Sequence, residues 1–323
     1  MNKIKEFENF FKSNKNKRVY ICGHKHPDHD STSSQFALQH LLKKLGILDV
    51  RCIKQADYPK SMYPMLKNLP TENITDINNE NAVLVCVDCA SIKRIDDPIE
   101  NKFPKPALQI DHHASNSCFA SNNFVNEDAT ATAEIISEIF IHYKIRPSQS
   151  VANLLYAGII SDSRAFSIES TTAKTFEIAK WLLNCGVKPN EIHNIVFNSE
   201  SVEKIKLQQA LFGSLEFFCE NQICIGYISQ NDMSRSGAKE FDKDKLVDKL
   251  LAIENVKIAA IINEKNNSLK VNIRALSSRS KVNETAEDFG GGGHFEASAF
   301  STYKITVPSL KRELVSRLKD KLY

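Results

Sequence analysis

The stretch VYICGHKHPDHDSTSS, residues 19–34, places three histidines and two aspartates within seven residues, directly after a short apolar run. The run Val19 to Cys22 predicts a buried strand, and residues 23–30 predict the loop that leaves its carboxyl end. Ser31 or Thr32 is expected to cap the following helix, because a hydroxyl there can accept a hydrogen bond from a free backbone N–H. In open α/β sheets ligands bind beyond the carboxyl ends of strands, so the stretch predicts a binding site.

Asp28 and Asp30 stand two residues apart in this loop. In an extended segment their carboxylates face the same side, where together with His24 they can hold two cations. The alternative is a solvated polar loop with an Asx turn, which a lone D-x-D after a strand also permits. The remainder of the chain decides between the two interpretations.

Further apolar segments also end in acidic or imidazole side chains. Two are short runs typical of strands, at residues 82–87 and 107–110, and one is a helix expected at residues 150–160. This repetition favours one shared site over a solvated loop. The side chains that follow these segments are Asp88, Asp111, His112, His113 and Asp162.

The composition is that of an ordinary globular chain with reduced cysteines. Its 323 residues suggest two domains, and its formal net charge of +3 supplies no basic field of the kind that binds long duplex nucleic acid. The eight cysteines lie mostly in apolar, strand-like runs, which is typical of thiols that stay reduced in a cytosol. No apolar run approaches the roughly 18 residues of a membrane span. We therefore expect a cytoplasmic protein that does not bind membranes.

The pattern of elements changes near residue 200. Before it, strands alternate with helices, which predicts an α/β domain at residues 1–200 whose mainly parallel sheet is flanked by helices. After it, a linker helix at residues 202–218 leads to a smaller, mixed α+β domain at residues 201–323, in which an Asn-Asn-Ser turn joins the last two of three strands. The three strands are expected at residues 223–229, 256–262 and 269–275.

The second domain contains four consecutive glycines, Gly290 to Gly293, followed by His294 and preceded by a predicted helix at residues 282–289. Such a run allows the backbone to approach another group closely or to adopt positive φ. A flexible linker is the alternative, although the run is short for one and its surroundings are apolar.

The ligand-type side chains of the first domain favour hard divalent cations. Carboxylates combined with imidazoles, without thiolates, suit Mn²⁺ or Mg²⁺ better than structural zinc. So many anionic groups need two cations, because a single one would leave buried carboxylates uncompensated. Two such ions activate a water molecule and stabilise both the attacking and the leaving oxygen at phosphorus, so the set predicts phosphoester hydrolysis.

Five motifs follow one another along nearly the whole chain: HKHPDHD, VCVDCA, IDHHAS, GIISDS and GGGGH. In this order they resemble the DHH phosphoesterase superfamily with its associated C-terminal domain. The compact two-domain layout resembles its NrnA group, nanoRNases that also act on 3′-phosphoadenosine 5′-phosphate (pAp). The resemblance implies a site for two metals. It assigns His24 and Asp28 to one metal, Asp30, His112 and Asp162 to the other, and Asp88 to both.

The resemblance also implies roles for residues beside the metals and in the second domain. Asp111 would orient an imidazole, and His113 would lie near the scissile phosphate as a donor to it or to the leaving group. In the second domain Arg274 would hold phosphate, and a glycine loop would bind the nucleotide. The loop residues concerned are Gly291, Gly292, Gly293 and His294.

The chain departs from the family pattern at positions whose roles the sequence leaves open. His29 stands between the two aspartates, where a small residue is common. Arg164 and Ser167 occupy positions at which relatives usually have glycine and arginine. Arg274 lies slightly further from the glycine loop than in the family, so Arg279 is an alternative phosphate ligand.

Together these implications predict a manganese-dependent phosphoesterase, with magnesium as the alternative ion. It is expected to hydrolyse very short oligoribonucleotides to mononucleotides and to dephosphorylate pAp, at an active site in the cleft between the domains. One alternative is a phosphodiesterase for cyclic di-AMP or its linear product pApA. Another is a nucleotide-binding regulator without catalysis. A homodimer is compatible with these expectations.

Overall fold

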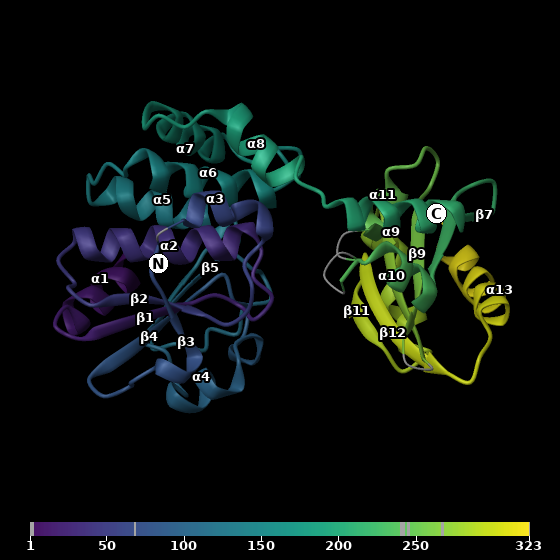
Figure 1. Cartoon of the computed structure of the whole chain (residues 1–323), viewed down its shortest axis with the longest axis horizontal. Coiled ribbons are helices and arrows are strands. Elements are labelled where there is room, and N and C mark those ends of the chain that lie inside the picture. Colours follow the sequence, from purple (N-terminus) through teal and green to yellow (C-terminus); the bar gives the residue numbers. More distant parts are fainter. Residues whose placement is uncertain (1–2, 68, 240–242, 244–245, 266–267, 323) are drawn as a thin grey trace. The chain divides into compact units, whose positions relative to one another are not determined.

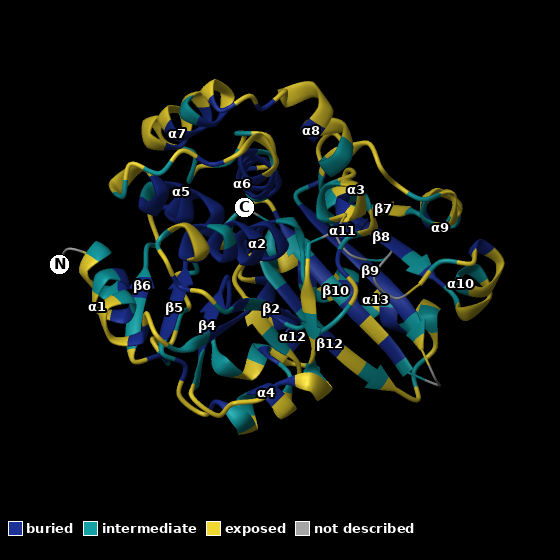
Figure 2. Cartoon of the chain, turned by 60° about the vertical axis from the view of Figure 1, so that its left-hand side comes forward, coloured by how far each residue is buried: buried dark blue, intermediate teal, exposed yellow. Residues whose placement is uncertain are grey.

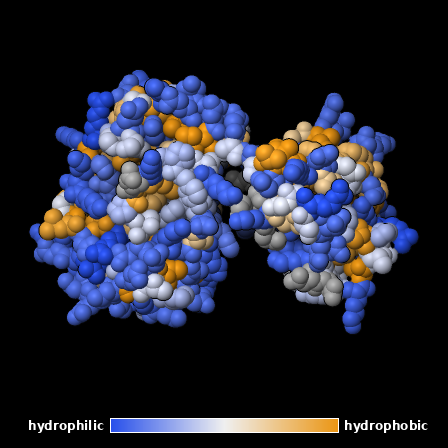
Figure 3. All heavy atoms as spheres, in the orientation of Figure 1, coloured by the Kyte–Doolittle hydropathy of each residue, from blue (hydrophilic) through white to orange (hydrophobic). Residues whose placement is uncertain are grey.

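The computed structural model describes residues 3–67, 69–239, 243, 246–265 and 268–322. The chain forms two compact units, residues 1–199 and residues 200–323. Among the described residues, every helix is too short or too polar to span a bilayer. On the face shown in Figure 3, each unit carries many hydrophilic side chains, with apolar side chains interspersed among them.

The first unit contains a sheet of six parallel strands in the order β3-β2-β1-β4-β5-β6. β1 and β4 are apolar and largely buried, as expected for the central strands of a parallel sheet. The strand order reverses between β1 and β4, which is the place where open α/β sheets form a ligand-binding crevice. The strands are β1 (Arg18–Cys22), β2 (Val50–Lys54), β3 (Thr71–Asn73), β4 (Ala82–Val87), β5 (Leu108–Asp111) and β6 (Asn122–Val125).

Helices cover both faces of this sheet. α2 is buried along most of its length between the sheet and the pair α5 and α6 (Figures 1 and 2). On the opposite face α4 packs against a smaller apolar cluster. Side chains of β1 alternate between the two layers, with Val19 and Ile21 on the α2 side and Tyr20 and Cys22 on the α4 side. The helices are α1 (Ile4–Asn14), α2 (His29–Lys44), α3 (Tyr63–Leu66), α4 (Asp97–Lys102), α5 (Thr132–His142), α6 (Gln149–Asp162), α7 (Ala173–Asn184) and α8 (Pro189–Phe197).

The second unit is built on a six-stranded mixed sheet in the order β11-β12-β10-β9-β8-β7. Among its described strands, β8 and β9 are parallel and all other neighbours are antiparallel. Two helices, α12 and α13, cover one face, while α9, α10 and α11 cover part of the other. The elements are α9 (Val202–Gly213), β7 (Glu216–Phe218), β8 (Ile223–Ile228), α10 (Gln230–Ser236), α11 (Leu246–Leu251), β9 (Ile258–Lys265), β10 (Ser268–Ala275), α12 (Val282–Glu287), β11 (Gly292–His294), β12 (Ala297–Tyr303) and α13 (Val307–Leu318).

This architecture confirms the predicted fold class, but the predicted start of α2 is wrong. The helix begins at His29, and its N-cap is Asp28, whose side chain accepts a hydrogen bond from Ser31 N at 3.0 Å. Aspartate is among the best N-cap residues, and here it takes the place expected for Ser31 or Thr32. Asp30 therefore lies in the first turn of a helix and not in an extended loop.

Two further expectations differ from the structure at the start of the second unit and in its hairpin. The linker helix α9 ends at Gly213, and residues 216–218 form strand β7 instead of continuing the helix. The expected Asn-Asn-Ser turn includes residues 266 and 267, which lie outside the described residues. The strands on both sides of it, β9 and β10, pair as an antiparallel hairpin.

Candidate metal centre

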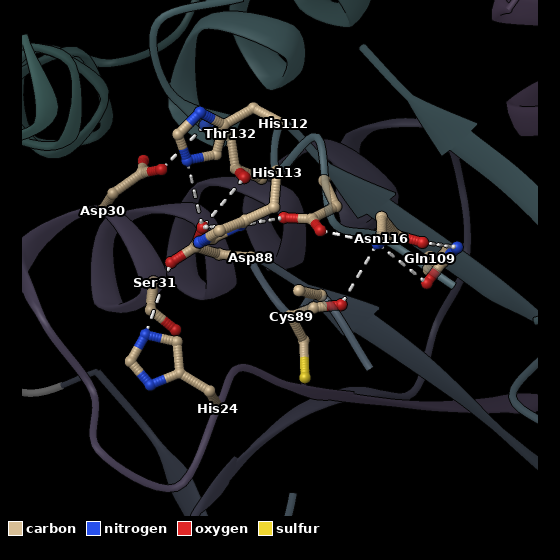
Figure 4. Close-up of polar contacts among 12 residues, drawn as sticks. His24, Asp30, Ser31, Asp88, Cys89, Gln109, His112, His113, Asn116 and Thr132 are labelled. Carbon is tan, nitrogen blue, oxygen red and sulfur yellow. Dashed lines mark hydrogen bonds and ion pairs between the residues drawn. The ribbon is translucent and has the colours of Figure 1, made fainter. Parts of the chain in front are cut away.

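Three of the predicted metal ligands follow parallel strands at the carboxyl edge of the first sheet (Figure 4). His24 comes after β1, Asp88 after β4 and His112 after β5. The two oxygens of Asp88 face different histidines: Oδ2 lies 3.6 Å from His24 Nε2, and Oδ1 lies 3.6 Å from His112 Nε2. The Asp88 backbone is left-handed, with φ of 53°, a conformation that aspartate tolerates better than most residues. This carboxylate therefore has the orientation that a bridge between two cations needs.

The remaining predicted ligands belong to helices. Asp28 caps α2, Asp30 lies in its first turn, and Asp162 lies in the last turn of α6. The helix and strand ligands form two groups, and within each group the ligand atoms all lie within 4.8 Å of one another. The structure thus brings the predicted sets together, and metal binding by them stays a prediction. The groups are His24, Asp28 and Asp88, and Asp30, His112 and Asp162.

Asp30 is fully buried, and both its oxygens accept hydrogen bonds from the start of α5. Thr132 N donates to Oδ2 at 2.7 Å, and Ala133 N donates to Oδ1 at 2.9 Å. The N-cap residue of α5, Ala131, has no polar side chain, so a carboxylate from α2 caps this helix instead. Helix α6 also packs closely against Asp30. A Cβ at Gly158 would lie 2.7 Å from Asp30 Oδ1 and 2.7 Å from Ala133 Cβ. Only glycine fits there without displacing Asp30.

The buried carboxylates make this centre unfavourable without added positive charge. Burial and the neighbouring carboxylates raise the pKa of Asp30 well above its ordinary value, and burial likewise raises the pKa of Asp162. Burial opposes protonation of the two imidazoles, but their carboxylate partners outweigh it and raise the pKa of His24 to about 9 and that of His112 to about 10. His112 Nε2 is buried and lies 3.3 Å from Asp162 Oδ2, a contact outside hydrogen-bond geometry. Such a set of oxygen and imidazole donors fits hard divalent cations.

Asp111 and His113 form a hydrogen-bonded pair beside the two groups. His113 Nδ1 lies 2.8 Å from Asp111 Oδ1 and 3.7 Å from Asp88 Oδ1. Burial would raise the pKa of Asp111, but the hydrogen bonds from His113 and Asn116 hold it below its ordinary value. His113 also lies in a third group that could hold an ion, with Asp88 and His112. Because Asp111 engages Nδ1, Nε2 is the nitrogen of His113 that is left to face a substrate.

In the second unit, Arg274 and His294 lie in one row across three strands. Arg274 of β10 pairs with Ala297 of β12, and Ala297 pairs with His294 of β11. Directly paired residues project from the same face of a sheet, so the two basic side chains stand on either side of a small residue. In a neighbouring row of this face, Ala299 pairs with Gly292. Small side chains therefore form a floor between Arg274 and His294.

Most of the glycine run has a structural role in this hairpin. A Cβ at Gly291 would lie 2.4 Å from Phe300 Cβ, and a Cβ at Gly293 would lie 2.4 Å from Ala297 O. Gly290 has left-handed backbone, with φ of 75°. The close approach predicted for the run is thus an approach of β11 to β12, and the run is not a flexible linker. Within the described part of the chain, Gly292 has open space where its Cβ would stand.

Arg164 opens a run of left-handed residues directly after α6. Arg164, Ala165 and Phe166 have φ of 47°, 58° and 66°. Ser167 Oγ donates to Arg164 O at 2.6 Å, and the Phe166 ring stacks on Phe176 with ring centroids 5.1 Å apart. The change from the family pattern therefore falls in a strained turn next to Asp162.

The other two residues with open roles are placed less centrally. His29 Nε2 lies 2.9 Å from Ser61 Oγ, so His29 joins the start of α2 to a 3₁₀ turn at Lys60–Met62. Arg279 is exposed on a 3₁₀ turn, Ser278–Ser280, and not on the strand row that holds Arg274.

The structure adds three residues to the site that the sequence did not single out. Thr132 Oγ1 donates to Asp88 Oδ1 at 3.2 Å, and Asn116 Nδ2 donates to Asp111 Oδ2 at 2.5 Å. The third is Gly158. A glycine inside an apolar helix lowers helix stability and so signals close packing, whereas Thr132 and Asn116 carry no comparable signal.

Two family models match the chain: the DHH family N-terminal domain at residues 18–159 and the DHHA1 domain at residues 221–322. The chain belongs to the DHH family. It is a DHH phosphoesterase, and DHH phosphoesterases are metal-dependent. The two matched regions lie one in each compact unit.

Relatives and solved structures resemble this DHH chain over most of its length. It is 27% identical to the probable bifunctional oligoribonuclease and PAP phosphatase NrnA of Streptococcus mutans, over 89% of this chain and 90% of the relative. It is 26% identical to the bifunctional oligoribonuclease and PAP phosphatase NrnA of Bacillus subtilis, over 88% of this chain and 89% of the relative. The crystal structure of an exopolyphosphatase-related protein from Bacteroides fragilis has the same fold, with a TM-score of 0.83 at 22% identity, covering 98% of this chain and 96% of that one.

Replacing Gly158 by alanine should weaken metal binding. The added methyl group meets Asp30 Oδ1 and Ala133 Cβ at 2.7 Å, so the carboxylate must move. Overpacking of this kind costs about 1–3 kcal/mol, and we expect roughly tenfold or greater loss of affinity for a divalent cation such as Mn²⁺. Calorimetric titration of the folded variant with Mn²⁺ measures the effect.

The matched control is Gly213→Ala, because Gly213 also lies in a helix but has open space around its Cβ position. This variant should bind Mn²⁺ as the wild type does. Unchanged affinity in Gly158→Ala would show that the contact with Asp30 does not set the geometry of the centre.

Proposed function

We propose that this DHH phosphoesterase uses two Mn²⁺ ions to hydrolyse very short oligoribonucleotides to mononucleotides and to dephosphorylate pAp. The observation that carries the proposal is the arrangement of six ligand-type side chains in two groups. Asp88 lies between the groups, with Oδ2 facing His24 of one and Oδ1 facing His112 of the other. The relatives named above as oligoribonucleases and PAP phosphatases support the choice of substrates. A regulator without catalysis would have no need to keep the complete set of ligands.

In the proposed site, His24 and Asp28 would hold one ion, and Asp30, His112 and Asp162 would hold the other. Asp88 would contribute to both. When bound, the two ions supply an activated water molecule and positive charge for the attacking and leaving oxygens at phosphorus. The protein fixes the donors before binding, since Thr132 holds Asp88 and the start of α5 holds Asp30.

His113 is proposed to act on the phosphate or on the leaving group. Its Nδ1 is held by Asp111, and its side chain is 31% exposed, whereas that of Asp111 is fully buried. Nε2 can therefore reach a substrate oxygen while Asp111 keeps the ring in one orientation. In its imidazolium form His113 would pass the Nε2 hydrogen to an alkoxide leaving group such as a ribose oxygen, and the neutral ring would keep its Nδ1 hydrogen bonded to Asp111.

The second unit is proposed to capture the substrate through the face that holds Arg274 and His294. A guanidinium can bind phosphate through two parallel hydrogen bonds, and an imidazole on the far side of the floor can bind a second polar group. The floor of Ala297, Ala299 and Gly292 leaves room for the flat part of a nucleotide. With only +3 formal charge over the chain, a long strand would gain little additional electrostatic binding, which favours short substrates.

A turnover series with Mn²⁺ tests the choice of substrate. We expect turnover of pAp and of RNA a few nucleotides long, falling as the RNA is lengthened. The other substrates in the series are pApA and cyclic di-AMP. Turnover of these two alone would favour the alternative phosphodiesterase, and turnover of none would contradict the proposed function.

Asp88→Asn should be the most damaging conservative change. It removes the charge shared by the two groups at nearly constant size, and should lower kcat by several powers of ten, since each 1.4 kcal/mol of lost transition-state stabilisation is about tenfold. The control is Asp97→Asn, an exposed carboxylate of α4 in the same unit. Full activity of Asp88→Asn, or of the wild type in EDTA, would disprove the two-metal site.

Arg274→Ala and His294→Ala should affect nucleotide substrates selectively. A lost charged contact to phosphate is worth about 1.5–3 kcal/mol, so kcat/KM for pAp should fall roughly ten- to a hundredfold or more. Turnover of bis(4-nitrophenyl) phosphate, which offers no nucleotide to the second unit, should change little. Mn²⁺ binding should be unchanged.

The control for these variants is Arg312→Ala, which removes an exposed cation from α13 on the opposite face of the second sheet. It should leave kcat/KM for pAp within a few-fold of the wild type. A parallel loss on both substrates in Arg274→Ala would mean that the second unit supports the metal centre itself. No loss on either would point to Arg279 or another group.

A further inference from the structure

We propose that Asn116 is a positioning residue for His113, acting through Asp111 and held in place by Gln109. The inference rests on the proposed function, in which His113 donates a proton to the leaving group. Asn116 touches neither substrate nor metal ligand in this role. Its effect is to fix the carboxylate that fixes the imidazole.

A continuous chain of hydrogen bonds joins the four residues (Figure 4). Gln109 Nε2 donates to Asn116 Oδ1 at 2.7 Å, and Asn116 Nδ2 donates to Asp111 Oδ2 at 2.5 Å. Asp111 Oδ1 lies 2.8 Å from His113 Nδ1. Gln109 and Asp111 are two residues apart in β5 and share one face of it, and the loop after the strand returns Asn116 between them.

The backbone decides which end of the Asn116 amide faces Asp111. Cys118 N can only donate, and it lies 2.7 Å from the amide atom of Asn116 that also receives the hydrogen bond from Gln109. This atom is therefore the oxygen, and the NH₂ group must point at Asp111. The orientation of the Asn116 amide thus follows from the backbone N–H of Cys118, which can only donate.

The orientation of the amide determines the roles along the rest of the chain. Asp111 accepts a hydrogen bond from Asn116 Nδ2 at Oδ2. As a carboxylate it also accepts a hydrogen bond at Oδ1, from Nδ1–H of His113. Asp111 thus holds the hydrogen on Nδ1, and Nε2 is directed away from Asp111. In the imidazolium Nε2 also carries a hydrogen, which passes to the leaving oxygen and leaves the neutral ring with its hydrogen on Nδ1. This is the arrangement in which a buried carboxylate holds a catalytic histidine in one tautomer.

Burial explains why Gln109 takes part. Gln109 and Asp111 are fully buried, and an amide inside a sheet is costly unless its polar atoms are paired. Asn116 satisfies Gln109 and also donates to Cys89 O at 3.3 Å, next to Asp88 in the sequence. A purely structural role for Asn116 as a loop anchor would predict a general loss of activity, which the following experiment separates from positioning.

The experiment compares Asn116→Asp, His113→Ala and the double variant on two substrates, with Mn²⁺ content and thermal unfolding measured in parallel. Asn116→Asp keeps the shape of the side chain but replaces the donor by an acceptor. The first substrate is a dinucleotide, whose alkoxide leaving group needs a proton. The second is bis(4-nitrophenyl) phosphate, whose leaving group departs without one.

We expect Asn116→Asp to lower kcat for the dinucleotide on the order of tenfold to a hundredfold, and His113→Ala to lower it by about a hundredfold to a thousandfold. The nitrophenyl substrate should lose less than a few-fold in both variants. The double variant should equal His113→Ala, because residues that act as one unit are not additive. Mn²⁺ content should match that of the wild type.

The control is Asn123→Ser, since the Asn123 amide also bridges a turn, bonding to N and O of Ala120. Among the described residues, none of its side-chain hydrogen bonds reaches Gln109, Asp111 or Asn116. It should retain full turnover of both substrates. Should Asn116→Asp fail to fold, Gln109→Met is the second variant, because it removes the hydrogen bond from Gln109 to Asn116. It should lower kcat for the dinucleotide selectively as well, but by a smaller factor.

Equal losses on both substrates, additive losses in the double variant, or a missing ion in Asn116→Asp would overturn the positioning role. In those cases the wild type still turns over the dinucleotide, and the proposed function stands. A wild type that turns over neither substrate with Mn²⁺ overturns both proposals.

Discussion

The burial of Asp30 constrains the packing of the whole first unit. An ionised carboxylate removed from water costs many kcal/mol unless it is paired, and here the first two N–H groups of α5 and the positive end of its helix dipole meet it. Helix α6 completes the enclosure because residue 158 is glycine. Two further carboxylates, Asp88 and Asp162, then repel Asp30 at close range. The packing of α2, α5 and α6 and the demand for cations are consequences of the same buried charge.

The part of this site at the strand ends could be predicted because His24, Asp88 and His112 each come within two residues of the end of an apolar run. Parallel strands that end at one edge bring such residues together whatever their distance in the sequence. The start of α2 could not be predicted in the same way, since Asp28, Ser31 and Thr32 are all good N-caps. The choice depends on tertiary packing: Ser31 Oγ would lie 2.0 Å from a Cβ at Gly23, so Ser31 fits inside the helix against the loop.

Two parts of the structure could not be predicted from local sequence patterns. The position of Asn116 depends on how the loop after β5 folds back, and the row of Arg274 and His294 depends on the pairing register of the second sheet. Arg274 and His294 are separated by a helix and a glycine run in the sequence, and only the pairing of both with Ala297 places them on one face. From the sequence, the glycine run is predicted to leave space for a bound nucleotide. In the structure most of that space is filled by the neighbouring strand, because the chain lies against β12 at Gly291, just before β11, and at Gly293 within it.

The left-handed turn after Asp162 has a consequence for how the surface of this protein can evolve. Left-handed backbone costs roughly 1–2 kcal/mol for each residue other than glycine, and the turn contains three such residues in succession, Arg164, Ala165 and Phe166. Packing must offset this cost, and the Phe166 ring lies against Tyr156 and against Phe176 on α7. Phe176 is 54% exposed and would pass for a position free to drift. Phe176 packs against Phe166 in the turn that follows Asp162, a predicted metal ligand. Substitution of this exposed aromatic side chain is therefore expected to disturb Asp162.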